Sequence, residues 1–330
     1  MLEFDRAPVS LGLYALLRDR HRRVVFTGMG ASHIAALPSW RRLVAAGKAA
    51  RWIDTENLLK RPQCVTPDSL LVATSRSGSN KHVCTLADQL GRTVRPAAVM
   101  AITDDGASPL AAVADCEVLL RSGASGSPKG FLNALTVHDY VASMILNEDN
   151  DDVSSTARAV ASTTLPAKLH RVAADVAAQE EPRLAYVGSG EHSAAALYAA
   201  LLTNEATEIV AQGHIVGQHQ RDLVLRANAQ LTAVFFGSHS RPDAAMRGLA
   251  ADLMAAGSNV VIVGGADVPG STYVPSHTGY VGAEVACNVV VIEHFVAALT
   301  TWMNTRNAHA GLGPGAWPSK CSGRRRISWL

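Results

Sequence analysis

A hydroxyl-rich loop is the segment of this sequence best suited to bind a ligand. It reads Thr74-Ser75-Arg76-Ser77-Gly78-Ser79-Asn80, after an apolar run at 70–73 and before a helix-like run at 82–90. Backbone N–H groups and serine hydroxyls can hydrogen-bond a phosphate, and the N-terminus of the following helix adds about half a positive charge. We call residues 74–80 the serine loop and predict that it binds phosphate, the alternative being an ordinary surface turn.

Nucleotide-binding motifs fit this sequence poorly. The serine loop lacks the Gly-Lys-Ser/Thr of a P-loop, which favours a smaller phosphorylated molecule. Gly28-x-Gly30 resembles the start of a dinucleotide fingerprint, and Asp54 lies near the expected ribose-binding acid. However, the third glycine is replaced by His33, and by Ser193 in the second half. Two failures at the same position argue against a dinucleotide.

The same pattern of apolar runs occurs twice along the chain. The first run of each half ends in Gly-x-Gly, and the serine loop has a weaker counterpart at 237–240. The first and second runs start 46 residues apart in one half and 47 in the other, and the second and third start 27 and 29 apart. This long period suits two copies of one α/β domain. The runs start at Val24, Leu70 and Ala97, and again at Leu184, Leu231 and Val260.

Continuous apolar strands that alternate with helix-like segments are typical of parallel sheets buried on both faces. We therefore predict an α/β chain with two flavodoxin-like, three-layer αβα domains. The expected boundaries are residues 1–150 for the first domain, 151–180 for a linker helix, 181–318 for the second domain and 319–330 for a tail. Ligands in such folds bind at the carboxyl ends of the strands, where the glycine and serine loops fall.

Composition favours a cytoplasmic protein of about two domains. The chain has 330 residues and a formal net charge of +2, so we expect no nucleic-acid or membrane partner. Five scattered cysteines without Cys-x-x-Cys spacing favour reduced thiols over disulfides or a zinc site, and we expect no metal or other cofactor. We also expect no signal peptide and no membrane span.

These motifs together resemble the double SIS (sugar isomerase) domain family. The sequence is similar to the isomerase domain of glucosamine-6-phosphate synthase and to the related fructosamine deglycases and amino-sugar-phosphate deaminases. Ser75-Arg76-Ser77-Gly78 resembles the family's Ser-x-Ser-Gly-x-Thr phosphate loop, with Asn80 in place of the threonine. Gly30-Ala31-Ser32 resembles Gly-Thr-Ser, and the second Gly-x-Gly at 188–190 resembles the opening of the second SIS copy. The resemblance covers residues from about 20 to 320 and implies two SIS domains.

The resemblance also implies a set of ligand-binding residues. The implied phosphate contacts are Ser32, Ser75, Arg76, Ser77 and Asn80. Other implied substrate contacts are Gly30, Lys129 and Arg221. Lys129 closes the segment Gly126-Ser127-Pro128-Lys129, which resembles the family's Ala-Ser-Thr-Lys at the start of a helix.

Three residues are implied to be catalytic. Glu205 occupies the place of the family's glutamate base, and Lys320 is the counterpart of a lysine in the C-terminal tail. The family's ring-opening histidine falls on or near Arg221, which makes nearby His219 the candidate, with His214 also close. The alternatives are a solvated helix position for Glu205, a polar loop around His219, and surface roles for Lys129 and Lys320.

The sequence departs from the family pattern next to Glu205. Tyr198 and Leu202 replace an acid and a lysine, seven and three residues before it. We still expect an isomerase, deaminase or deglycase of a sugar phosphate, in which a glutamate moves a proton at the carbon next to the carbonyl. The alternative is a non-catalytic sugar-phosphate-binding regulator. A DNA-binding sensor is disfavoured, because too few residues precede the first strand for a helix-turn-helix domain. The resemblance also implies a homodimer.

Overall fold

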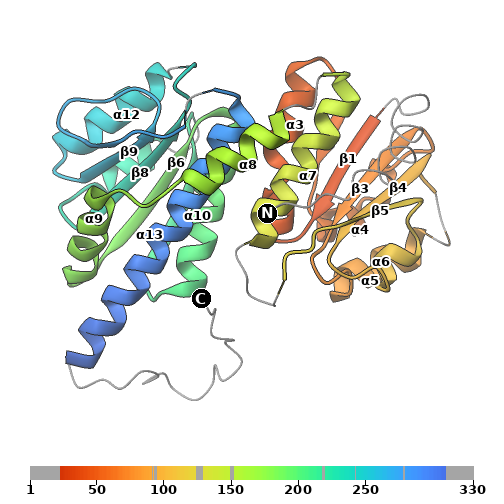
Figure 1. The fold of residues 1–330 in the computed structure, drawn as a ribbon, viewed down its shortest axis with the longest axis horizontal. Helices are drawn as coiled ribbons and strands as arrows, with labels where there is room; N and C mark the ends of the chain where they lie inside the picture. Colours follow the sequence, from red (N-terminus) through yellow and green to blue (C-terminus); the bar gives the residue numbers. More distant parts are fainter. Residues whose placement is uncertain are drawn as a thin grey trace. The chain divides into compact units, whose positions relative to one another are not determined.

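The computed structural model describes residues 23–309, apart from 91, 93–94, 124–128, 149–151, 218–219, 242 and 278. The described chain divides into two compact units near residue 157. Unit 1 comprises the described residues up to Ala157, and unit 2 comprises those from Arg158 onward. Each unit contains one five-stranded sheet with helices packed around it (Figure 1).

The sheet of unit 1 is entirely parallel, with strand order β2-β1-β3-β4-β5. Its strands are β1 (Arg23–Gly28), β2 (Ala50–Trp52), β3 (Ser69–Thr74), β4 (Ala98–Thr103) and β5 (Cys116–Leu119). Its helices are α2 (Ala31–Ile34), α3 (Leu37–Ala45), α4 (Thr55–Lys60), the 3-10 turn η1 (Pro62–Cys64), α5 (Lys81–Leu90), α6 (Pro109–Ala112) and α7 (Lys129–Leu146).

The sheet of unit 2 repeats this arrangement, with strand order β10-β9-β8-β6-β7. Matching β6 to β1 makes the two orders identical, so the sequence repeat is a structural repeat. Its strands are β6 (Arg183–Gly188), β7 (Val210–Ile215), β8 (Leu231–Gly237), β9 (Asn259–Gly264) and β10 (Thr272–Val274). Its helices are α9 (Ala167–Ala178), the 3-10 turn η2 (Gly190–His192), α10 (Ser193–Ala206), α11 (Gln220–Leu225), α12 (Ala244–Ala255) and α13 (Val281–His309).

Two helices occupy the segment expected to form one linker helix. α8 (Asp152–Ser162) is followed by α9, and Pro166 is the N-cap of α9. Proline disfavours helical conformation in the residue before it, which explains the interruption.

Alternate residues of the central strands face different helices, which confirms the three-layer prediction. In unit 1, Leu71 and Val99 pack with α5 and α6, whereas the ring of Phe26 on the opposite face meets His138 of α7 at 5.5 Å. In unit 2, Phe235 packs with α12, whereas the hydroxyl of Tyr186 bonds the α10 residue Thr203 at 2.8 Å. β3, β4 and β8 are buried along their whole length, as parallel strands covered on both faces should be.

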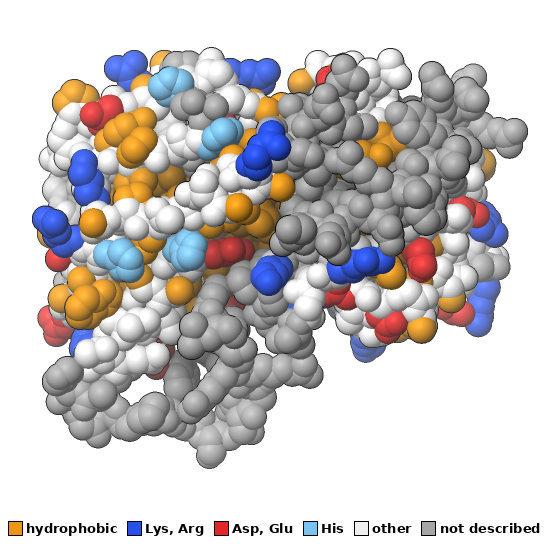
Figure 2. Space-filling view, viewed as in Figure 1, with side chains coloured by type: hydrophobic (Ala, Val, Ile, Leu, Met, Phe, Trp, Pro, Cys, Tyr) orange, Lys and Arg blue, Asp and Glu red, His pale blue; other side chains and the backbone are white. Residues whose placement is uncertain are grey.

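One described helix segment, Val281–Arg306, has the length and hydropathy of a membrane span. However, 67% of its most apolar window is buried within the structure. α13 packs against α9 and α10 (Figure 1), so its apolar residues belong to the core of unit 2. On the face shown in Figure 2, acidic and basic side chains are scattered among uncharged ones, in keeping with the near-neutral net charge.

The turn from β6 into η2 and α10 requires a glycine. A Cβ atom on Gly188 would lie 2.5 Å from the carbonyl oxygen of His192 and 2.6 Å from Cα of Ser193. We expect Gly188→Ala to lower the free energy of unfolding by about 1–3 kcal/mol, because backbone atoms must move apart. Urea denaturation measures this change.

Gly248→Ala is the matched control, because a Cβ there meets no atom within 4 Å inside α12. It should raise stability by about 0.5–1 kcal/mol, since glycine is a poor residue for a helix interior. Equal effects of the two substitutions would contradict the steric assignment.

Candidate active site

The serine loop lies where ligands bind in doubly wound sheets. β1 and β3 are neighbours, and the chain leaves them toward opposite edges of the sheet. Their last residues, Gly28 and Thr74, are register partners. The loop carrying Gly30 and Ser32 therefore begins beside the serine loop at the carboxyl edge of the sheet, which is the predicted position for both.

The shape of the serine loop depends on Gly78. Its φ angle is +59°, and a Cβ atom there would lie 2.1 Å from Oγ of Ser108. The backbone N–H of Gly78 donates to the carbonyl of Ser75 at 3.0 Å, which closes the turn. Ser75 is buried, whereas Ser77 and Ser79 are exposed. The turn thus presents hydroxyl groups at the strand end without an intervening bulky side chain.

Asn80 caps the helix that follows the loop. Its Oδ1 accepts a hydrogen bond from the backbone N–H of Val83 at 3.0 Å, at the start of α5. Since the oxygen is used in this bond, the amide nitrogen is the side-chain group left to donate a hydrogen bond to a ligand. This arrangement suits the predicted donor role of Asn80.

Arg76 is held within the protein rather than extended into solvent. Its Nε lies 3.1 Å from Oδ2 of Asp104, and its Nη2 donates to the carbonyl of Gly123 at 3.3 Å. Asp104 also accepts a hydrogen bond from the backbone N–H of Ser122 at 2.8 Å and one from the Ser122 hydroxyl. Arg76 therefore fixes neighbouring loops, and its direct contact with phosphate stays a prediction.

Two uncharged histidines lie behind the two loops. The ring of His33 stacks on Trp52 with centroids 4.1 Å apart, and burial lowers the pKa of His33 to about 4. Nε2 of His138 is 2.9 Å from the hydroxyl of Thr74, and burial lowers the pKa of His138 to about 3. Neither ring carries a positive charge near neutral pH, so neither supplies an ion pair to an anion.

Glu205 lies at the C-terminal end of α10 in unit 2. It is twelve residues from Ser193, or roughly 18 Å along the helix. It therefore lies far from the carboxyl end of its own unit's β6. Its side chain is exposed, yet partial desolvation raises its pKa above the ordinary value. A raised pKa suits a proton-transferring carboxylate.

A second carboxylate, which no sequence motif predicted, lies beside Tyr198. The hydroxyl of Tyr198 donates to Oε1 of Glu293 on α13 at 3.2 Å. Burial raises the pKa of Glu293 to about 7. Burial also raises the pKa of Tyr198, and the negative charges of Glu293 and Glu205 add to this effect. A carboxylate from α13 thus approaches the tyrosine that replaces the family's acid.

The remaining predicted residues are scattered. Lys129 is exposed at the start of α7, and Arg221 is exposed on α11. His219 and Lys320 lie outside the described residues. Leu202 is 5% exposed, so an apolar side chain fills the place of the family lysine. Within the described part of the chain, no group of three His, Cys, Asp or Glu side chains could hold a metal ion.

Comparison with known proteins bears on the fold of the chain. The family model for the SIS domain matches residues 16–144. The matched residues include most of unit 1, which is therefore similar to a SIS domain. This agrees with the resemblance inferred from the serine loop, and no curated protein matches the sequence.

Solved structures extend the likeness over both units. The C-terminal domain of glucosamine-fructose-6-phosphate aminotransferase from Francisella tularensis has a TM-score of 0.75 at 13% identity, covering 88% of this chain and 86% of that one. Tagatose-6-phosphate ketose/aldose isomerase from Escherichia coli has a TM-score of 0.73 at 19% identity, covering 96% of this chain and 90% of that one. Glucosamine-6-phosphate deaminase from Thermotoga maritima has a TM-score of 0.63 at 18% identity, covering 89% of this chain and 91% of that one. The chain therefore has the fold of SIS phosphosugar isomerases.

Glu293 should make the stability of the protein depend on pH. Its folded pKa of about 7 exceeds the ordinary 4.5, so the folded state keeps a proton that the unfolded state loses first. The free energy of unfolding should fall as pH rises from 4.5 through 7, by at most about 3 kcal/mol. Glu293→Gln should remove this loss, since glutamine still accepts a hydrogen bond from Tyr198.

The measurement is urea denaturation of wild type and variant at pH 5 and pH 8. The variant should gain stability relative to wild type at pH 8 but not at pH 5. Glu208→Gln changes an exposed carboxylate in the same unit and should show no such difference. A Glu293→Gln effect that is the same at both pH values would contradict the raised pKa.

Proposed function

We propose that this protein binds a sugar phosphate at the serine loop and catalyses its isomerisation, deamination or deglycation, with Glu205 as the base. The observation that carries the proposal is the serine loop itself, whose turn depends on Gly78 and which lies where the chain leaves the neighbouring strands β1 and β3 toward opposite sheet edges. An isomerase of tagatose 6-phosphate and a deaminase of glucosamine 6-phosphate share the fold, which supports a sugar-phosphate ligand.

Phosphate recognition would rest on neutral donors. The serine hydroxyls of the loop, the amide nitrogen of Asn80 and the first N–H groups of α5 point to one anion site. Ser32 and Gly30 extend it from the neighbouring strand end. Because Arg76 is paired with Asp104, the hydroxyls and N–H groups carry most of the recognition.

The chemical step needs one base that moves a proton between adjacent carbons. Glu205 would take the proton from the carbon next to the carbonyl, leaving an enediolate, and return it to the neighbouring carbon in an isomerisation. Its raised pKa brings the carboxylate nearer to the pKa that two-way proton transfer requires. His219 is proposed to open the sugar ring, and Lys320 to stabilise the enediolate or form an imine.

A second candidate function is non-catalytic sugar-phosphate binding that regulates a partner. Buried Leu202 favours it, because the charge that the family places near its glutamate is missing. Both functions require phosphate binding, and only the first requires proton exchange at carbon.

The double variant Ser75→Ala/Ser77→Ala should weaken sugar-phosphate binding and keep the fold. Each hydroxyl bond lost to a charged group should cost about 1.5–3 kcal/mol. A thermal-shift screen of hexose and hexosamine 6-phosphates selects the ligand, since one at 100 times its dissociation constant adds about 2.7 kcal/mol of stability. Calorimetry then measures affinity.

Thr85→Ala is the control, because it removes an exposed hydroxyl one turn into α5. Its affinity should equal that of wild type. Unchanged affinity in the double serine variant would remove the phosphate-loop assignment.

Glu205→Gln should lower turnover by about 10²–10⁴-fold while ligand binding persists, because the amide cannot act as a base. The direct measurement is exchange of solvent deuterium into the sugar carbon, followed by NMR. Glu208→Gln, a nearby exposed carboxylate, should exchange like wild type. Tight binding by the wild type without exchange on any candidate would favour the regulatory function. Exchange that survives in Glu205→Gln would move the base elsewhere, with His219 the first residue to test.

A further inference from the structure

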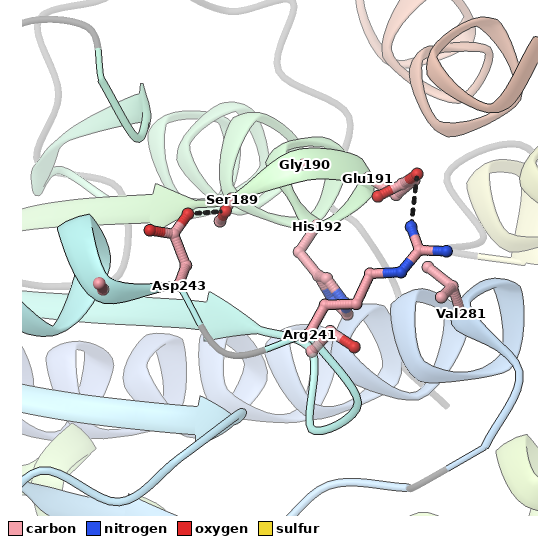
Figure 3. Close-up of a pocket in the computed structure, with 9 residues that line it drawn as sticks. Ser189, Gly190, Glu191, His192, Arg241, Asp243 and Val281 are labelled. Carbon is pink, nitrogen blue, oxygen red and sulfur yellow. Dashed lines mark hydrogen bonds and ion pairs between the residues drawn. The ribbon is translucent and has the colours of Figure 1, made fainter. Parts of the chain in front are cut away.

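The polar groups at the carboxyl edge of the unit 2 sheet are bonded to one another. A pocket of about 410 Å³ lies there, between the segment after β6 and the segment after β8 (Figure 3). On one side of it the Ser189 hydroxyl bonds Asp243, and on another Nη1 of Arg241 lies 3.9 Å from Oε1 of Glu191. Further polar side chains beside it are bonded within the chain, namely Ser238 to Glu284 and Asn288 to His192. We therefore assign no ligand to this pocket.

A second pocket of unit 2 lies at the opposite, amino edge of the same sheet. It has a volume of about 180 Å³ and lies between α9 and the first residues of β8, β9 and β10. We call it the amino-edge pocket. Its walls include Val172, Asp175 and Val176 of α9, and Thr232, Asn259 and Thr272 of the three strands. Since a single water molecule needs far less space, the pocket has room for a small organic molecule.

Thr232 is a buried polar residue that lines this pocket and has no partner. Its neighbours in β8, Leu231 and Ala233, pack in the core cluster that contains α12 residues, so its side chain points to the other face of the sheet. Thr232 is 1% exposed, and its Oγ1 forms no hydrogen bond with the part of the chain that the structure describes. A buried hydroxyl without a partner is costly, which points to a partner supplied by a ligand in the pocket.

The polar groups beside Thr232 can accept hydrogen bonds. The Ser258 hydroxyl donates to the carbonyl of Asn228 at 3.1 Å, which leaves its oxygen free to accept. Nδ2 of Asn259 donates to the carbonyl of Ala229 at 3.4 Å, which leaves Oδ1 as the acceptor. Asn259 and Thr232 are register partners, so their side chains lie on the same face of the sheet. A ligand between them must therefore donate several hydrogen bonds.

The charge of the amino-edge pocket disfavours an anion. Asp175 carries a carboxylate, and none of the described residues that line the pocket is a lysine, arginine or histidine. An ammonium group is also disfavoured, because Asp175 is exposed and an ion pair in solvent contributes little. The buried acceptors are uncharged and would not offset the lost hydration of a cation. Hydroxyl groups donate hydrogen bonds without this cost.

We propose that the amino-edge pocket binds a small neutral polyol, whose hydroxyl groups bond Thr232, Ser258 and Asn259. Thr232 would both donate and accept, and the other two would accept. The site is independent of the function proposed for the serine loop, because it lies in unit 2 and needs no phosphate. It also lies away from the carboxyl edge, where doubly wound sheets usually bind their substrates.

NMR with three probes tests the chemistry. Glycerol is the neutral polyol, serinol carries an ammonium group in place of its central hydroxyl, and glycerol phosphate adds an anion. The pocket-lining residues Val176 and Val261 report binding through their methyl groups, with Val25 of unit 1 as the reference. Glycerol should shift both methyl signals saturably, and the two charged probes should bind there at least about tenfold more weakly. No saturable shift with glycerol, or equal affinity for either charged probe, would overturn the proposal.

Filling the pocket tests the location. Val172→Trp places a large side chain in the pocket and should abolish the glycerol shifts. Arg171→Trp is the matched control, because Arg171 is the exposed preceding residue of α9 and is not part of the pocket wall. It should leave glycerol affinity unchanged. Shifts that survive Val172→Trp would overturn the assignment to this pocket.

Removing one hydroxyl tests the contact. Thr232→Val keeps the shape of the side chain and should weaken glycerol binding about two- to tenfold. It should not lower the stability of the unliganded protein, because the hydroxyl has no partner to lose. Thr207→Val is the control, since the Thr207 hydroxyl donates to the carbonyl of Thr203 at 2.8 Å and accepts from the N–H of Ile209 at 3.1 Å. It should lower stability and keep glycerol binding.

Urea denaturation and the same NMR titration compare the two threonine variants. Unchanged glycerol affinity in Thr232→Val, or a loss of stability as large as that of Thr207→Val, would overturn the proposal. Should Val172→Trp fail to fold, Thr232→Val is the variant that decides.

Discussion

The close approach of a strand end to the start of the following helix organises both units. A side chain at Gly28 would meet the backbone of Ser32, His33 and Thr74 at 3.0 Å, and one at Gly188 would meet the backbone of unit 2 more closely still. This contact brings the first loop against the end of the neighbouring strand. Because the chain leaves these strands in opposite directions, each unit has at this sheet edge the position at which doubly wound sheets bind ligands.

The residues at this position differ in chemistry between the two units, although the strand order is the same. In unit 1, hydroxyls and N–H groups surround a turn whose nearby acid is already paired. In unit 2, the equivalent strand ends hold carboxylates backed by a buried histidine and asparagine. The repeat therefore preserves the positions at which ligands can bind while each copy carries its own side chains.

Patterns along the chain were sufficient to predict the fold. Continuous apolar runs, matched spacings and repeated Gly-x-Gly turns indicated two parallel α/β domains, and the family model and solved structures agree. The serine loop was also predictable, because its residues are consecutive. Contacts between distant residues were not. Tyr198 meets Glu293 across 95 positions, and Thr74 meets His138 across 64. Glu293 and His138 each lie inside a long helix, in which the sequence pattern indicates only the apolar face. No neighbouring residue in the sequence therefore identifies the distant side chain that each of them contacts.

The two neutral histidines behind the serine loop bear on the pH dependence of the phosphate binding that we propose for this loop. A histidine that gained a proton on mild acidification would strengthen anion binding as pH fell. His33 and His138 stay unprotonated across that range, so they add no such gain. A phosphate ester itself gains a proton near pH 6. The two histidines therefore make a constant contribution to the electric field at the serine loop. At the proposed site, discrimination between the dianion and the monoanion would fall to the fixed N–H and hydroxyl dipoles of the loop.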